Sequence, residues 1–113
     1  MANNTKLLKG SLINIILKLL GDNDKMYGYE ITKKVKELTN GQLSLTEGAL
    51  YPTLHKLEAE GLLSADVEHI DNRPRKYYSL TKTGKKEAAV RLESFKTFVT
   101  QMQLVLNLNP AIK

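Results

Sequence analysis

The sequence contains no cysteine among its 113 residues. This absence excludes disulfides, a thiolate nucleophile and cysteine-ligated zinc or iron–sulfur centres, and it is typical of the reducing cytoplasm, where we expect the protein. Long hydrophobic runs are missing too. The longest apolar stretch, residues 12–20, is interrupted by Asn14 and Lys18 and is shorter than the roughly 20 residues that a membrane-spanning helix needs. A polar turn follows it in place of a cleavage site, so we expect neither a membrane span nor export.

Groups of side chains that carry catalysis are also lacking. His55 and His69 are the only histidines, and neither has a nucleophile or carboxylate partner at the spacing of a triad or a metal site. His55 and Glu58 could supply two metal ligands, which are too few for a metal site. Because a glycine-rich phosphate-binding loop is absent as well, we predict no enzymatic activity, no metal and no cofactor.

Basic side chains are concentrated in one segment. The net charge is only +5, yet residues 73–91 hold seven basic side chains and a single acidic one, whereas residues 1–72 carry a slight acidic excess. A positive field confined to so short a segment favours a polyanionic partner. The alternative interpretation is the ordinary solvated start of a helix.

Hydrophobic periodicity predicts two helices before residue 40. The first spans about residues 6–20 and ends with Gly21 in the C′ position. It is apolar on more than one face, so we expect its second apolar surface to contact another chain. The second helix is predicted to run to Leu38 and to end at Asn40-Gly41, with an apolar stripe formed by Tyr27, Ile31, Val35 and Leu38.

A third helix is predicted to begin after Ser44 or Thr46, either of which is a suitable N-cap, and to end near Gly61. Its core side consists of Leu50, Leu54 and Leu57. The other side has little charge, and it combines small residues with side chains that can hydrogen-bond to base edges or phosphates. These outward residues are Gly48, Tyr51, Pro52, His55, Lys56 and Ala59. A polar face with an accidental tyrosine is the alternative interpretation.

Two extended runs, about residues 63–70 and 75–80, are joined by the turn-forming tetrapeptide Asp71-Asn72-Arg73-Pro74 and predict a β-hairpin. One of Tyr77 and Tyr78 is expected to face the core. Thr81 then caps a long last helix, about residues 82–107. This order predicts a mostly α fold with a small β-hairpin: a winged helix-turn-helix over residues 1–81, then a C-terminal dimerisation helix and tail over residues 82–113.

We therefore predict that the third helix enters the major groove of duplex DNA and that the basic hairpin holds the DNA backbone. The predicted DNA-binding residues are Tyr27, Thr46, Gly48, Tyr51, Pro52, His55, Lys56, Arg73, Arg75 and Lys76.

The last helix has a regular apolar seam with spacings of four and three residues, typical of a helix that packs against another helix. This seam begins at Ala88, and few residues follow the helix that could cover the seam. The seam could fold back on its own domain, but with the apolar first helix it favours a subunit contact. The predicted dimer interface consists of Leu12, Ile16, Leu92, Phe95, Val99, Met102 and Leu106.

Several motifs resemble the PadR family of winged-helix regulators in order and spacing over about residues 6–90. They are Leu8-Lys9-Gly10, Tyr27-Gly28-Tyr29-Glu30-Ile31, Glu47-Gly48-Ala49-Leu50-Tyr51-Pro52, the leucine-rich segment 54–63 and Arg75-Lys76-Tyr77-Tyr78 with the following Leu80, Thr81 and Gly84. The single last helix resembles the short subfamily. The tip of the hairpin departs from the family, because Asp71-Asn72-Arg73-Pro74 replaces a tip rich in glycine and arginine.

This resemblance implies a homodimer on a pseudo-palindromic operator, controlling a detoxification, efflux or stress gene. It also implies a flat hydrophobic effector held by aromatic side chains between the subunits. The ligand-binding residues are then Phe95, which matches the aromatic position, with Phe98 and Met102 nearby. The alternative is that the two phenylalanines simply fill the subunit contact.

The sequence thus favours a homodimeric repressor released by a small-molecule inducer. A winged-helix adaptor for protein contacts is one alternative, because fold alone does not determine function. A small-molecule-binding scaffold without DNA binding is another. The basic segment 73–91 distinguishes the first interpretation from the adaptor, which has no need of it.

Overall fold

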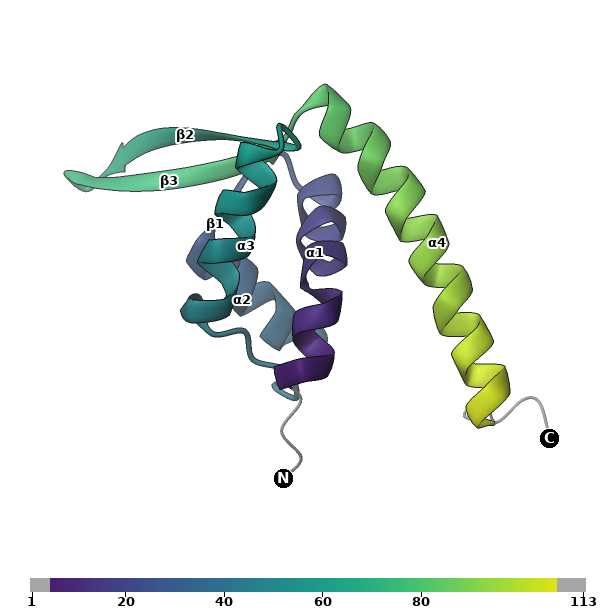
Figure 1. The fold of residues 1–113 in the computed structure, drawn as a ribbon. Helices are drawn as coiled ribbons and strands as arrows, with labels where there is room; N and C mark the ends of the chain where they lie inside the picture. Colours follow the sequence, from purple (N-terminus) through teal and green to yellow (C-terminus); the bar gives the residue numbers. More distant parts are fainter. Residues whose placement is uncertain (1–4, 108–113) are drawn as a thin grey trace.

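The computed structural model describes residues 5–107 and is mostly helical, with a small three-stranded antiparallel sheet (Figure 1). The elements are α1 (Thr5–Asp22), β1 (Met26–Tyr27), α2 (Gly28–Leu38), α3 (Glu47–Ala59), β2 (Leu63–Ile70), β3 (Arg73–Leu80) and α4 (Lys82–Leu106). In Figure 1 the hairpin of β2 and β3 projects from the helices as a wing, and α4 slants away from α1. The predicted winged-helix fold with a long last helix is confirmed. The tail, residues 108–113, lies outside the described residues.

The core forms where α1, α2 and α3 meet the base of the sheet. The leucine stripe of α3 is buried as predicted, and Tyr78 is the tyrosine that faces the core. Leu12 and Ile16 are only 1% and 0% exposed within this single chain. Their assignment to the dimer interface is therefore wrong, because their side of α1 is covered by the chain's own core. Another side of α1 contacts α4 of the same chain.

The structure extends one predicted helix, selects one of two predicted caps and removes one residue from a predicted core stripe. Helix α1 continues through Gly21, and Asn23 ends it by donating a side-chain hydrogen bond to the Leu19 carbonyl at 2.8 Å. Thr46, not Ser44, caps α3, because its hydroxyl accepts the Ala49 N–H at 3.2 Å. Leu38 is 66% exposed rather than part of the core stripe. Short-range polar contacts decide the end of α1 and the start of α3, and several residues could have supplied them.

A two-residue strand, β1, was not predicted. Its residues pair with β3, which is the central strand of the order β1-β3-β2. Met26 lies opposite Tyr78 on the core side, and Tyr27 lies opposite Tyr77 on the other side. This pairing joins the start of α2 to the base of the wing.

The turn of the wing is shorter than the expected tetrapeptide. Only Asp71 and Asn72 form it, both with positive φ angles, 52° and 63°, which suits a two-residue hairpin turn. Arg73 and Pro74 belong to β3. Pro74 lies one step beyond the pair that flanks the turn, so its missing N–H points away from β2, and β1 is too short to reach it.

The start of α4 is joined to the end of α3. The Thr81 hydroxyl accepts the Gly84 N–H at 2.9 Å and donates to the Gly61 carbonyl at 2.7 Å. The Thr81 N–H donates to the Leu62 carbonyl at 3.0 Å. Gly84 is buried directly against that same carbonyl oxygen. Two consecutive carbonyls after α3 thus hold the first turn of α4.

Candidate nucleic-acid interface

The outer face of α3 is exposed as the helical spacing predicted. Gly48, Pro52, His55 and Lys56 are all exposed, and Thr46 is exposed at the cap. Among the described residues, no atom outside the local helix backbone lies within 4 Å of where a Cβ of Gly48 would be, so another molecule can approach the α3 backbone closely here. This face can offer hydrogen-bond donors and acceptors to base edges.

Tyr51 differs from its neighbours on α3, because it is half-buried and packs against α2. A Cβ on Gly28 would lie 2.3 Å from the Tyr51 hydroxyl oxygen, so the ring occupies the space that Gly28 leaves open. Burial raises the pKa of Tyr51, and the phenol stays neutral at physiological pH. The ring lies 6.3 Å from the His55 ring, centroid to centroid. Tyr51 thus fixes the packing of α2 on α3 beneath the exposed His55.

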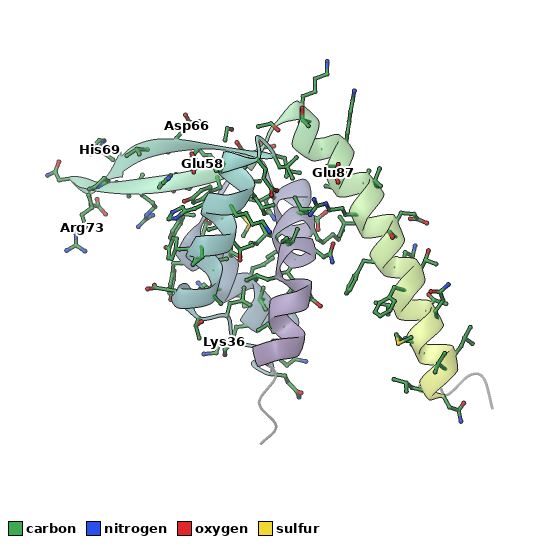
Figure 2. All side chains as sticks on the ribbon, in the orientation of Figure 1. Lys36, Glu58, Asp66, His69, Arg73 and Glu87 are labelled. Carbon is green, nitrogen blue, oxygen red and sulfur yellow. The ribbon has the colours of Figure 1, made fainter. Side chains whose placement is uncertain are left out.

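The three predicted cations of the wing do not form one cluster. Strand alternation places Lys76 on the same side as the buried Tyr78, and its ammonium forms an ion pair at 3.3 Å with Glu58 of α3. Arg75 points to the opposite side, where its guanidinium carbon lies 4.2 Å from the centre of the Tyr27 ring. Figure 2 shows Arg73 near the tip of the wing, well away from Glu58. Within the part of the chain that the structure describes, neither Arg73 nor Arg75 has an ion-pair partner, and Arg73 is the more exposed of the two.

Sequence reasoning missed the contribution of Lys25 and Tyr29 to this region. The Lys25 ammonium forms an ion pair with Glu68 of β2 and lies 4.8 Å from the centre of the Tyr77 ring. The Tyr29 ring stacks on Tyr27 at 6.4 Å between centroids. Neither residue could be placed here without the pairing of β1 with β3, for which the sequence has no local signal.

The PadR-like family model of transcriptional regulators matches residues 16–90, a segment that contains α2, α3 and the whole wing. The chain belongs to the PadR-like family. It is 39% identical over 70 residues to a transcriptional regulator from Mycobacterium tuberculosis, covering 62% of this chain and 62% of that protein. The match thus spans less than two thirds of that relative. Membership of a family of transcriptional regulators agrees with the prediction of a regulatory rather than an enzymatic protein.

Solved structures of transcriptional regulators have the same fold. One from Clostridium thermocellum superposes with a TM-score of 0.76 at 27% identity, covering 93% of this chain and 98% of that one. A PadR-like regulator from Bacillus cereus superposes with a TM-score of 0.74 at 26% identity, covering 89% and 96% of the two chains.

In this PadR-like chain, none of the helices over residues 5–107 is long and apolar enough to cross a membrane.

The apolar seam of this PadR-like regulator is divided between two environments. Towards the start of α4, Ala88 is buried, and Leu92 and Phe95 line an apolar groove of about 300 Å³ with residues of α1 and α2. Farther along, Val99 and Leu106 are 38% and 58% exposed. The first part of the seam thus packs on its own domain, whereas Val99 and Leu106 in the second part stay exposed within the described residues.

The three predicted ligand-binding residues do not share one cavity in the single chain. Phe95 lines the apolar groove, and together with Phe98 it lines a second groove between α1 and α4. The two rings lie 6.4 Å apart, centroid to centroid. Met102 is half-buried one helical turn farther on and lines neither groove.

Proposed function

We propose that this PadR-like regulator is a homodimeric repressor that binds a pseudo-palindromic operator and is released by a small-molecule effector. The exposed, weakly charged face of α3 is the observation that carries the proposal, because it offers His55 and Lys56 to base edges beside a glycine that permits close approach. The wing cations beside it suit backbone contact. In a dimer, two such helices would enter successive major grooves about 34–36 Å apart.

Selection of bound fragments from genomic DNA tests the proposal and yields the operator. With that operator, His55→Ala is expected to lose about 1–3 kcal/mol of binding free energy, with a smaller loss on random duplex DNA, because a base contact is removed. Fluorescence anisotropy on both duplexes measures the difference. His69→Ala on the wing is the matched control and should affect both duplexes alike. Equal losses for His55→Ala on the two duplexes would mean that α3 does not read bases, and absence of any selected fragment would favour the adaptor.

The effector site is proposed at α4, where Phe95, Phe98 and Met102 would meet a second subunit. The apolar character of the groove and the closeness of the two phenylalanine rings support a flat, hydrophobic ligand. Such a ligand releases DNA only if it binds the DNA-free arrangement of the subunits more tightly.

Titration of planar aromatic compounds, followed by calorimetry and by operator release, tests this site. Phe95→Ala is expected to weaken binding by at least about two- to tenfold, because a stacking ring is worth roughly 0.5–1.5 kcal/mol beyond the area it buries. Val105→Ala, on an exposed position of the same helix, is the control. The site is excluded if no compound binds the wild-type protein at millimolar concentration or if Phe95→Ala binds equally well.

A further inference from the structure

The side chain of Arg75 lies on an aromatic pair at the base of the wing. Its guanidinium carbon is 4.2 Å from the centre of the Tyr27 ring, and that ring meets Tyr77 edge to face, with centroids 5.4 Å apart and planes at 77°. Tyr77 is two residues along β3 from Arg75, on the same side of the strand. Two strands and the start of a helix thus contribute to the surroundings of one cation.

The aromatic pair is anchored by the backbone. Tyr27 pairs with Tyr77 between β1 and β3, and its N–H donates to the Glu30 carboxylate of α2 at 3.1 Å. Both tyrosines are half-buried. The surface on which Arg75 rests is therefore fixed relative to the helix-turn-helix.

The charge of Arg75 is not neutralised by a carboxylate. Glu68 is its cross-strand partner in β2, yet that carboxylate forms its ion pair with Lys25. Among the described residues, no acidic group lies within ion-pair distance of Arg75. The guanidinium carbon lies over the Tyr27 ring, and an arginine carries five N–H donors in a planar group, so donors remain that can reach a phosphate.

Lys76, the next residue of β3, differs from Arg75 because its charge is already paired. It points to the other side of the sheet, where Glu58 of α3 already pairs with it. Adjacent residues of one strand therefore differ in role: Lys76 ties the wing to α3, and Arg75 retains an uncompensated charge in a fixed position.

We propose that Tyr27 and Tyr77 are positioning residues that hold the Arg75 guanidinium in a fixed orientation for a DNA backbone phosphate. This inference rests on the proposed function as a DNA-binding protein, and it assigns Tyr27 a role through Arg75 rather than at the DNA itself. A pre-positioned arginine does not lose side-chain freedom on binding, a cost that otherwise weakens affinity by roughly two- to tenfold for one long side chain.

The test measures affinity for a random-sequence duplex at several salt concentrations. Arg75→Ala should reduce the salt slope by about one, as expected for a lost phosphate contact. Tyr27→Leu should weaken binding by roughly two- to tenfold with the slope unchanged, because the charge remains but its orientation is lost. Tyr27→Phe retains the ring and should bind like the wild type. In the Arg75→Ala background, Tyr27→Leu should have no further effect.

Tyr29→Leu is the matched control, because Tyr29 stacks on Tyr27 and is 60% exposed but does not contact the guanidinium. Arg75→Lys leaves the aromatic pair intact and serves if Tyr27→Leu unfolds on a thermal melt. It keeps the charge and loses the planar group, so it should also weaken binding with an unchanged slope. Equal effects of Tyr27→Leu in the two backgrounds, or full affinity of Arg75→Lys, would overturn the positioning role alone. If the wild-type protein binds no duplex even at low salt, the proposed function fails with it.

Discussion

Replacing Gly84 with alanine is expected to lower the free energy of unfolding by about 1–3 kcal/mol, and the melting temperature by roughly 4–8 °C for each kcal/mol. A Cβ at this position would lie 2.0 Å from the Leu62 carbonyl oxygen and 3.0 Å from its carbon. Both are backbone atoms, so no side chain can rotate away to make room. The first turn of α4 would have to shift, which would also strain the hydrogen bond from the Thr81 N–H to Leu62.

Gly48→Ala is the matched control for this substitution. It introduces the same methyl group into α3, where no atom of residues 5–107 beyond the local helix backbone lies within 4 Å of the new Cβ. Because alanine favours helix over glycine, this variant should gain about 0.5–1 kcal/mol. Urea denaturation followed by circular dichroism measures both changes. A neutral or stabilising Gly84→Ala would contradict the close packing of α4 against the end of α3.

Val99→Asp is expected to disrupt the proposed dimer and to leave monomer or aggregates. Val99 lies on the part of the apolar seam that the chain itself leaves exposed, and in a dimer this position would be covered. An unpaired carboxylate buried at a subunit contact costs about 3–5 kcal/mol, which weakens the dimer by more than a hundredfold. Sedimentation velocity over a range of concentrations measures the change.

Thr100→Asp places the same charge on the next residue, which is also exposed but lies about 100° further around the helix, off the seam. This variant should dimerise like the wild type. If the wild-type protein is itself a monomer at micromolar concentration, the dimer is excluded, and recognition of a pseudo-palindromic operator is excluded with it.

The sequence predicts best the elements in which apolar residues recur at a regular spacing. Leu50, Leu54 and Leu57 recur at the helical spacing, and all three are buried. Thr81 was predicted as the cap of α4 because a threonine precedes an uninterrupted helical pattern, and its hydroxyl does accept the Gly84 N–H. By contrast, β1 has two residues, too few for any period, and it exists only because β3 lies beside it some fifty residues later in the chain.

The candidate site follows the same division. The exposure of His55 and Lys56 depends on the angle around one helix, which sequence alone can supply. The surroundings of Tyr51 depend on Gly28 in another helix, and the different directions of Arg75 and Lys76 depend on strand register. Contacts across the fold therefore decide which cations are already paired before any ligand arrives.

Thr81, Gly84 and the two carbonyls after α3 fix the first turn of α4, so a tilt of this helix displaces its far end most. With 25 residues, α4 is about 37 Å long. A tilt of about 5° about this first turn moves Leu106 by about 3 Å, so a small repacking at the far end corresponds to a fine angular adjustment at the other. Because Thr81 is hydrogen-bonded directly to the Gly61 and Leu62 carbonyls, a tilt of α4 is transmitted to the end of α3. In the proposed dimer, repacking at the ends of α4 would therefore adjust the distance between the two α3 helices.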